Sequence, residues 1–102
     1  MTKPEGSDPM KTKIVSRHYL LEGRVQGVGF RYFVYRVAQE AGVKGWVRNL
    51  FDGRVEVRAE GASDAMRDFS RKLEMGPPMS SVRRITVDEV DSEGFDTFGI
   101  TG

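Results

Sequence analysis

The chain of 102 residues contains no cysteine, a single histidine and almost no excess of charge of either sign. Without cysteine it can form no disulfide, use no thiolate nucleophile and build no cysteine-ligated metal site. Its 16 basic and 15 acidic residues leave a formal net charge of +1. That near-balance does not favour a nucleic acid or an acidic polymer as a partner.

Long apolar runs are also missing, because a membrane-spanning helix needs about 20 consecutive apolar residues and no run approaches that length. Residues 1–13 contain Pro4, Gly6 and Pro9 but lack the apolar centre of a signal peptide. We therefore expect a flexible tail over 1–13 and one domain over 14–102. We further expect this domain to be a soluble, cytoplasmic monomer without a membrane partner.

Apolar periodicity predicts two helices. The clearer one runs from Phe30 to Ala41, where apolar residues recur at intervals of three and four and Gly42 follows as a C-terminal cap. The second begins after Ser63, a candidate N-cap, and is stopped by Gly76 and two prolines.

Strands are predicted over 14–22, 43–50, 54–60 and 81–90, with a short last strand near Phe98 and Ile100. In the third of these, apolar residues alternate with Arg54, Glu56, Arg58 and Glu60, so that one face is expected to be buried and the other to face water. In the fourth, Ile85 and Val87 are expected on one face.

The order of the elements is β-α-β-β-α-β with a possible fifth strand. This order is typical of a ferredoxin-like, split βαβ sandwich of the α+β class. It implies a mixed sheet of four to five strands with two helices on one face. The first and second strands are then parallel, and the third lies between them.

Between the first strand and the first helix lies a glycine-rich stretch, Gly23-Arg24-Val25-Gln26-Gly27-Val28-Gly29-Phe30-Arg31. Glycine lets a ligand approach the backbone, and the first N–H groups of a helix have no partner inside the helix. With the arginine that follows, these groups can bind a phosphate. The alternative is an ordinary strand-to-helix turn, since the spacing matches neither the P-loop nor the dinucleotide pattern.

The parallel arrangement of the first two strands brings Asn49, at the end of the second strand, to the edge of the sheet where the glycine loop begins. If Val47 faces the helices, alternation points Asn49 toward Arg31 at the start of the first helix. Taken alone, Asn49 could simply cap the hairpin turn. Its predicted convergence with Arg31 and the loop N–H groups favours a site.

Few other residues offer chemistry. His18, the only histidine, falls in the first predicted strand, and nothing places a serine and an acid beside it, so we interpret it as a structural or surface residue. No cluster of Asp, Glu or His has metal-ligand spacing. Asp52 and Glu56 are interpreted as a turn residue and part of a solvated strand face. The remaining sources of catalysis are the positioning of the reactants and electrostatic stabilisation. These two effects suffice for phosphoryl transfer when the leaving group is a carboxylate.

The glycine stretch resembles the signature of the acylphosphatase family. A second block, from Gly42 to Asn49 and on to Asp52-Gly53-Arg54-Val55-Glu56, resembles the family's second signature, in the right order and spacing. The resemblance covers about residues 15–101. It implies an α/β sandwich that hydrolyses the carboxyl–phosphate bond of acyl phosphates without a metal, another cofactor or a covalent intermediate.

The resemblance also implies roles for individual residues. Arg31 is expected to bind the substrate phosphate, and Asn49 to orient the attacking water, whose deprotonation the substrate's own phosphate assists. The phosphate site would also accept inorganic phosphate or another anion. It is completed by the backbone N–H groups of the loop residues Arg24, Val25, Gln26, Gly27, Val28 and Gly29.

Two other functions share parts of this pattern. One is a non-hydrolytic anion-binding module, because similar domains occur within larger maturation enzymes that handle carbamoyl phosphate. The chain stops after one domain, which favours a free-standing enzyme. The other is an RNA-recognition domain of the same element order, which would need stacking aromatics on its open sheet face. The charged residues of the third strand disfavour it.

Overall fold

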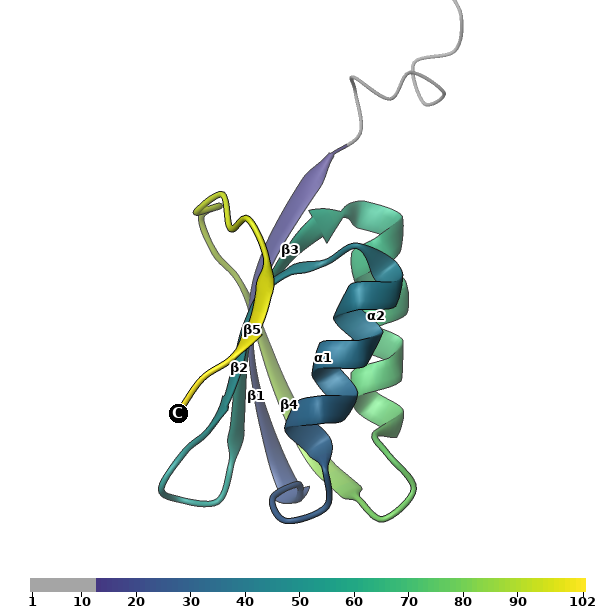
Figure 1. Ribbon diagram of the computed structural model, residues 1–102, viewed down its shortest axis with the longest axis vertical. Helices are drawn as coiled ribbons and strands as arrows, with labels where there is room; N and C mark the ends of the chain where they lie inside the picture. The colour runs from purple at the N-terminus through teal and green to yellow at the C-terminus, as the bar shows by residue number, and fades with distance from the viewer. Residues whose placement is uncertain (1–12) are drawn as a thin grey trace, which may run out of the picture.

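The fold is a five-stranded sheet with two helices packed on one of its faces (Figure 1). The computed structural model describes residues 13–102. Its elements are β1 (Ile14–Arg24), α1 (Phe30–Ala41), β2 (Lys44–Asn49), β3 (Val55–Ala62), α2 (Ser63–Met75), β4 (Ser81–Glu89) and β5 (Phe98–Ile100).

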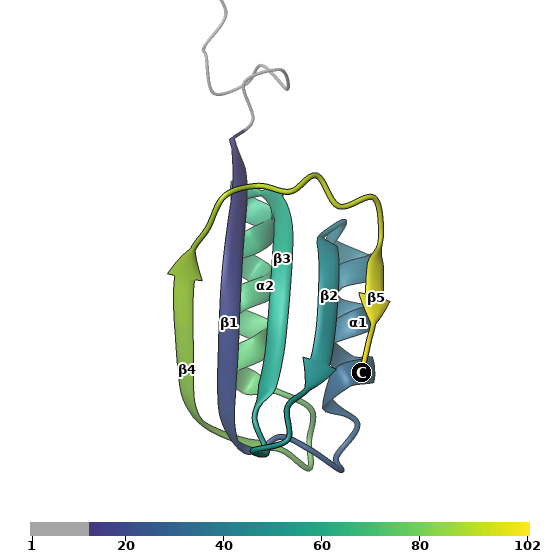
Figure 2. The ribbon, with the colours of Figure 1, turned by 90° about the vertical axis from the view of Figure 1, so that its left-hand side faces the viewer.

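The strands lie in the order β4-β1-β3-β2-β5, as Figure 2 shows. β3 pairs antiparallel with both β1 and β2, so β1 and β2 run parallel to each other. β5 adds to the edge of the sheet parallel to β2. The predicted ferredoxin-like α+β fold, with its fifth strand, is confirmed.

The core fills the space between the sheet and the helices. α1 buries one stripe of its surface, as the periodicity predicted, through Phe30, Val34, Val37 and Ala38. Gly42 closes this helix in the left-handed conformation at φ 73°, which an L-residue adopts only with strain. Val47 of β2 is fully buried in this core. Residues two positions away in this strand, such as Asn49, therefore lie on the same face of the sheet, toward the helices.

Several predicted boundaries were wrong by one or two residues. β1 extends through Arg24 instead of ending at residue 22, because its last two residues pair with β4 beyond a bulge at Glu22 and Gly23. β2 is shorter than the predicted 43–50, and β4 ends at Glu89.

The junction between β3 and α2 also differs from the prediction. β3 continues past Gly61 to Ala62, since Ala62 still pairs with Ile14 of β1. Ser63 is therefore the first residue of α2 and not its N-cap, and no side chain within residues 13–102 caps this helix. Ile85 and Val87 are two residues apart in β4, as the prediction of a shared face requires, but only Ile85 packs against the core and Val87 is exposed.

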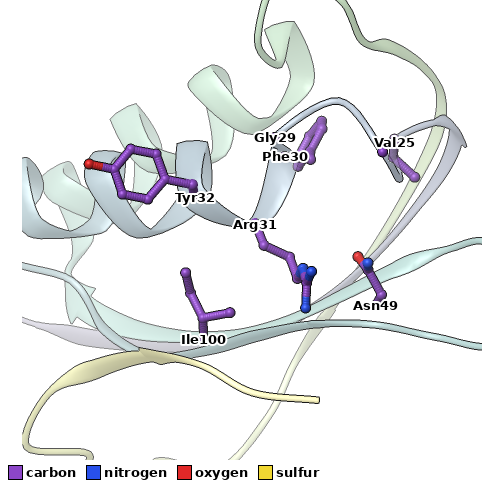
Figure 3. Close-up of a pocket in the computed structure, with 8 residues that line it drawn as sticks. Val25, Gly29, Phe30, Arg31, Tyr32, Asn49 and Ile100 are labelled. Atoms are coloured by element: carbon purple, nitrogen blue, oxygen red, sulfur yellow. The ribbon is translucent and has the colours of Figure 1, made fainter.

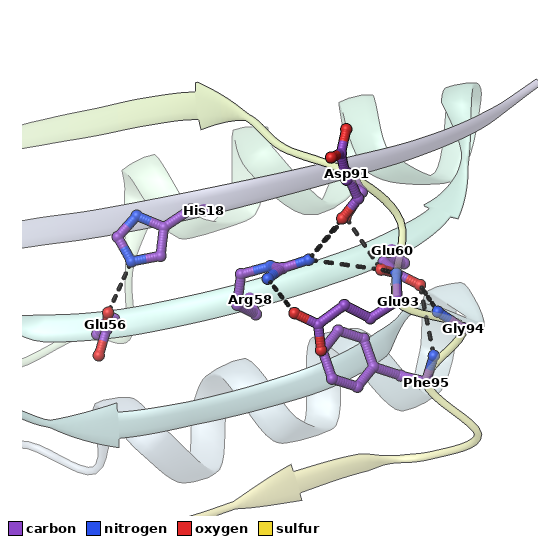
Figure 4. A network of polar contacts seen from close by, with 9 residues as sticks. His18, Glu56, Arg58, Glu60, Asp91, Glu93, Gly94 and Phe95 are labelled. Carbon is purple, nitrogen blue, oxygen red and sulfur yellow. Dashed lines mark hydrogen bonds and ion pairs between the residues drawn. The ribbon is translucent and has the colours of Figure 1, made fainter.

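The open face of β3 is less solvated than its alternation suggested. Glu60 is buried, and its carboxylate accepts hydrogen bonds from the Ser16 hydroxyl and from the backbone N–H groups of Glu93 and Gly94 (Figure 4). Arg58 lies beside it and pairs with the Glu93 carboxylate at 2.9 Å. The segment between β4 and β5 is thus held down on the sheet.

The tail predicted over 1–13 lies outside the described residues except for Lys13, whose carbonyl accepts a hydrogen bond from the N–H of Ser63. Within residues 13–102, neither helix has the length and apolar character needed to cross a bilayer.

Candidate active site

The glycine loop links the end of β1 to the start of α1 and leaves the first backbone N–H groups of that helix uncapped. Gly29 is the N-cap residue at φ 76°, and no side chain of the described residues accepts a hydrogen bond there. The first turn of α1 carries no acidic residue. Because the positive end of the helix dipole is not neutralised locally, the loop can bind an anion.

The three glycines of this stretch serve two different purposes. Gly23 lies in the β1 bulge, where an added Cβ would come within 2.1 Å of the Ser81 carbonyl oxygen, so it allows two strands to approach. Gly27 and Gly29 have φ of 74° and 76°, and a Cβ on either would meet no atom of the part of the chain that the structure describes within 4 Å. At these two positions the backbone conformation, and not crowding, requires glycine.

Gly27 and Gly29 line a cavity of about 270 Å³ (Figure 3). Arg31 reaches it from α1, and Asn49 reaches it from the end of β2. The remaining lining residues are Val25, Phe30, Tyr32 and Ile100. The convergence of Arg31 and Asn49 that topology predicted is therefore present.

Asn49 occupies the last position of β2, opposite Val55 of β3. It lies on the same face as the buried Val47, which directs its carboxamide toward the helix layer (Figure 3). The Oδ1 atom of Asn49 is buried and has no hydrogen-bond partner within residues 13–102. A buried polar atom without a partner costs free energy of about 1–3 kcal/mol, so its presence here suggests a ligand.

Arg31 places a permanent positive charge at the same cavity. Its Nη1 atom donates a hydrogen bond of 3.3 Å to the main-chain oxygen of Gly102, and its side chain is only partly covered. The guanidinium keeps further donors, since it has five N–H groups in a planar fork.

Three of the predicted phosphate-binding residues do not line this cavity. Arg24 is exposed and pairs with Ser81 at the end of β1. Val28 packs against the core. The side chain of Gln26 donates hydrogen bonds to the carbonyl oxygens of Leu50, at 2.7 Å, and Arg54, at 3.0 Å, and so ties the glycine loop to the hairpin that follows Asn49.

Sequence reasoning missed three residues that line the cavity, Phe30, Tyr32 and Ile100. Phe30 was assigned only to the apolar stripe of α1. Tyr32 was hard to find because it falls off the apolar stripe of α1. Ile100 reaches the cavity only because β5 pairs parallel with β2, with Ile100 opposite Val47. The alternation of Phe98 and Ile100 was the one available signal.

His18 is remote from this constellation and lies on the open face, where its Nε2 atom is 2.7 Å from Glu56 (Figure 4). Burial raises the pKa of Glu56, but contacts with His18 and Arg48 outweigh it and leave that pKa below its ordinary value. Asp52 accepts hydrogen bonds from the backbone and side chain of Arg54, which makes it a turn residue. Within residues 13–102, no three His, Asp or Glu residues are grouped as metal ligands would be.

Comparison with known proteins identifies relatives of this chain. The acylphosphatase family model matches residues 17–100. An acylphosphatase of Thermotoga petrophila is 49% identical over 80 residues, which cover 78% of this chain and 89% of that relative.

Solved structures agree with this result. The crystal structure of acylphosphatase from Bacillus subtilis has a TM-score of 0.84 and 43% identity, covering 88% of this chain and 100% of the other. Full-length HypF, solved in a phosphate- and nucleotide-bound form, matches 89% of this chain with a TM-score of 0.81 and 32% identity, over 12% of its own length.

Proposed function

The chain belongs to the acylphosphatase family and hydrolyses the carboxyl–phosphate bond of small acyl phosphates, and we propose that the cavity beside Arg31 and Asn49 is where it does so. The observation that supports this most strongly is the meeting of three features in one cavity: a guanidinium, a helix N-terminus and a buried carboxamide oxygen, of which the last two have no side-chain cap and no hydrogen-bond partner, respectively, among residues 13–102.

The phosphate of the substrate is held by Arg31 and by backbone N–H groups of residues 24–29 and the first turn of α1. Positive charge and fixed donors stabilise the negative charge that spreads over the transferring phosphoryl oxygens. Arg24, Gln26 and Val28 contribute only through their backbone in this proposal, because none of the three lines the cavity. Inorganic phosphate, the product, binds to the same groups.

Asn49 holds the attacking water. The water oxygen forms the new bond to phosphorus, while the bond from phosphorus to the carboxylate oxygen breaks and its electron pair stays on the departing carboxylate. The water proton passes to a phosphate oxygen of the substrate. Because a carboxylate is a weak base, its departure needs no proton donor from the protein.

The wider setting of the enzyme is also a proposal. We take it to act without a metal or other cofactor, as a cytoplasmic monomer, with residues 1–13 outside the acylphosphatase-like domain. Nucleic acid is not among the proposed partners, because the open face of β3 carries charged residues that pair with one another, such as Arg58 with Glu60. The Trp46 ring on that face already lies under the Arg48 guanidinium, 5.2 Å away.

Replacement of Arg31 tests the proposed site. In Arg31→Ala, kcat for benzoyl phosphate should fall by about 10²–10³-fold with the fold intact, because the variant lacks the positive charge that stabilises the transferring phosphoryl group. Arg67→Ala is a matched control, since Arg67 is an exposed arginine of α2 outside the cavity. Turnover of Arg31→Ala at the wild-type rate would overturn the assignment of the site. Tight phosphate binding by the wild type with no turnover of any acyl phosphate would instead indicate a binding module.

A further inference from the structure

The cavity has two chemically different ends. The groups proposed to act on the phosphate belong to Gly27, Gly29, Arg31 and Asn49, which all line the cavity. In the view of Figure 3, Tyr32 and Ile100 lie on the other side of Arg31 from Asn49. Both are exposed, Tyr32 at 59% and Ile100 at 45%, so the cavity continues onto an apolar rim that is open to solvent.

The geometry of phosphoryl transfer relates these two ends. The attacking and leaving oxygens lie roughly in line through phosphorus, so they occupy opposite sides of the phosphate. If Asn49 holds the attacking water, the carboxylate leaves on the side away from Asn49. Tyr32 and Ile100 are the lining residues that Figure 3 shows across Arg31 from Asn49.

We propose that Tyr32 and Ile100 form the subsite for the acyl group of the substrate, and that this subsite favours uncharged apolar acyl groups, planar aromatic ones in particular. The inference rests on the proposed roles of Arg31 and Asn49. It adds a substrate class to the activity, which those two residues do not determine because they act on the phosphate and the water.

The surroundings of the two side chains suit this role. The Tyr32 ring stacks on Tyr35 with centroids 6.2 Å apart, and the Arg36 guanidinium lies 5.9 Å from its centroid. These neighbours restrict the ring on one side, which reduces the rotamer freedom that is lost when an acyl group packs against its exposed side. Ile100 is fixed by the pairing of β5 with β2 and faces the same space.

A second surface near Asn49 offers a direct comparison. Phe51, at the tip of the β2–β3 hairpin, is fully exposed and lines a separate hollow with Leu50, Gln26 and Arg48. Asn49 borders both cavities and so lies between this hollow and the phosphate site. In-line attack from Asn49 directs the leaving group away from Phe51, although Phe51 is the more exposed aromatic residue.

Paired substrates test the subsite. Benzoyl phosphate and acetyl phosphate share the phosphate and release carboxylates of similar basicity, so the ratio of their kcat/KM values reports contacts with the acyl group. We expect this ratio to fall about threefold to tenfold in Tyr32→Ala and in Ile100→Ala, as a lost aromatic or aliphatic contact would cause. Tyr32→Phe keeps the ring and should keep the ratio. Inhibition by inorganic phosphate, which has no acyl group, should change by less than about twofold in all three variants.

Phe51→Ala is the matched control and should leave the ratio within about twofold of wild type. If Tyr32→Ala and Ile100→Ala both keep the wild-type ratio, the acyl subsite is wrong, while Arg31 and Asn49 can still act as proposed. If Phe51→Ala lowers the ratio instead, the acyl group lies on the Asn49 side, which overturns the inference. If the wild-type protein hydrolyses neither substrate, the activity itself is contradicted. This outcome differs from the two above, in which the wild-type protein is active.

Discussion

Arg31 and Asn49 approach one cavity from two elements that are separate in the sequence. Arg31 stands in the first turn of α1, and Asn49 stands at the last position of β2. The parallel course of β1 and β2 brings the ends of both strands to the same edge of the sheet (Figure 2). A charge and a carboxamide are thereby held on rigid elements, which suits a reaction that depends on positioning.

Gly29 and Gly42, the residues at the two ends of α1, allow a test of whether the glycine loop takes part in catalysis. They flank α1 in almost the same left-handed conformation, with φ of 76° and 73°, and a Cβ on either would contact none of the described residues. Replacement of either by alanine should lower the free energy of unfolding by about 1–2 kcal/mol. Only Gly29→Ala should also reduce turnover of benzoyl phosphate by the folded enzyme, because only Gly29 lines the cavity. Equal residual activities in the two variants, at matched folded fractions, would contradict a catalytic role for the loop.

Glu60 should make the protein sensitive to acid. Burial raises the pKa of Glu60, but hydrogen bonds from the N–H groups of Glu93 and Gly94 and from Ser16 outweigh it and hold that pKa below its ordinary value. Since the folded-state pKa is below the unfolded one, this stabilisation is complete above a pH of about 4.3 and is lost as the pH falls toward the folded-state pKa. Glu60→Gln should lower the free energy of unfolding at pH 7 by about 1–3 kcal/mol and flatten its dependence on acid.

Urea unfolding followed across the acidic range provides the measurement for Glu60. Glu89→Gln serves as the control, because Glu89 pairs with Arg17 at 2.9 Å on the exposed edge of the sheet. An exposed pair of this kind contributes about 0.2–1 kcal/mol and should change the acid dependence little. If the two variants lose stability equally at every pH, the buried network around Glu60 does not hold the β4–β5 segment.

Activity should not depend on a divalent metal. In the proposed mechanism the charge that stabilises the phosphoryl group comes from Arg31 and backbone N–H groups, both supplied by the chain. Benzoyl phosphate hydrolysis should therefore be the same before and after prolonged treatment with a chelator. Loss of activity that returns on addition of a divalent cation would refute the metal-independent mechanism.

The fold and the centre of the site could be predicted because they depend on local patterns. The stripe from Phe30 to Ala41 defined α1, and alternation in β2 placed Asn49 on the helix side of the sheet once Val47 was assigned to the core. The parallel relation of β1 and β2 followed from the order of the elements alone.

The remaining features depend on contacts between distant segments. The burial of Glu60 requires residues 93–95 to fold back over β3, and the place of Gly23 in a bulge requires β4 beside β1. Ile100 reaches the cavity only through the pairing of β5 with β2. No spacing within one segment reports such pairings, which explains why these residues were assigned a solvated face, a loop and a short terminal strand.

The most direct test of the mechanism is the turnover of benzoyl phosphate by Asn49→Ala, with inhibition by inorganic phosphate measured in the same assay. We expect kcat to fall by at least about 10²-fold, since the attacking water is no longer held, while the inhibition constant for phosphate changes by less than about threefold. Turnover by Asn49→Ala at the wild-type rate would contradict the assignment of Asn49 to the attacking water. Loss of phosphate inhibition together with turnover would contradict the division of roles in which Asn49 holds the water and Arg31 and the loop hold the phosphate.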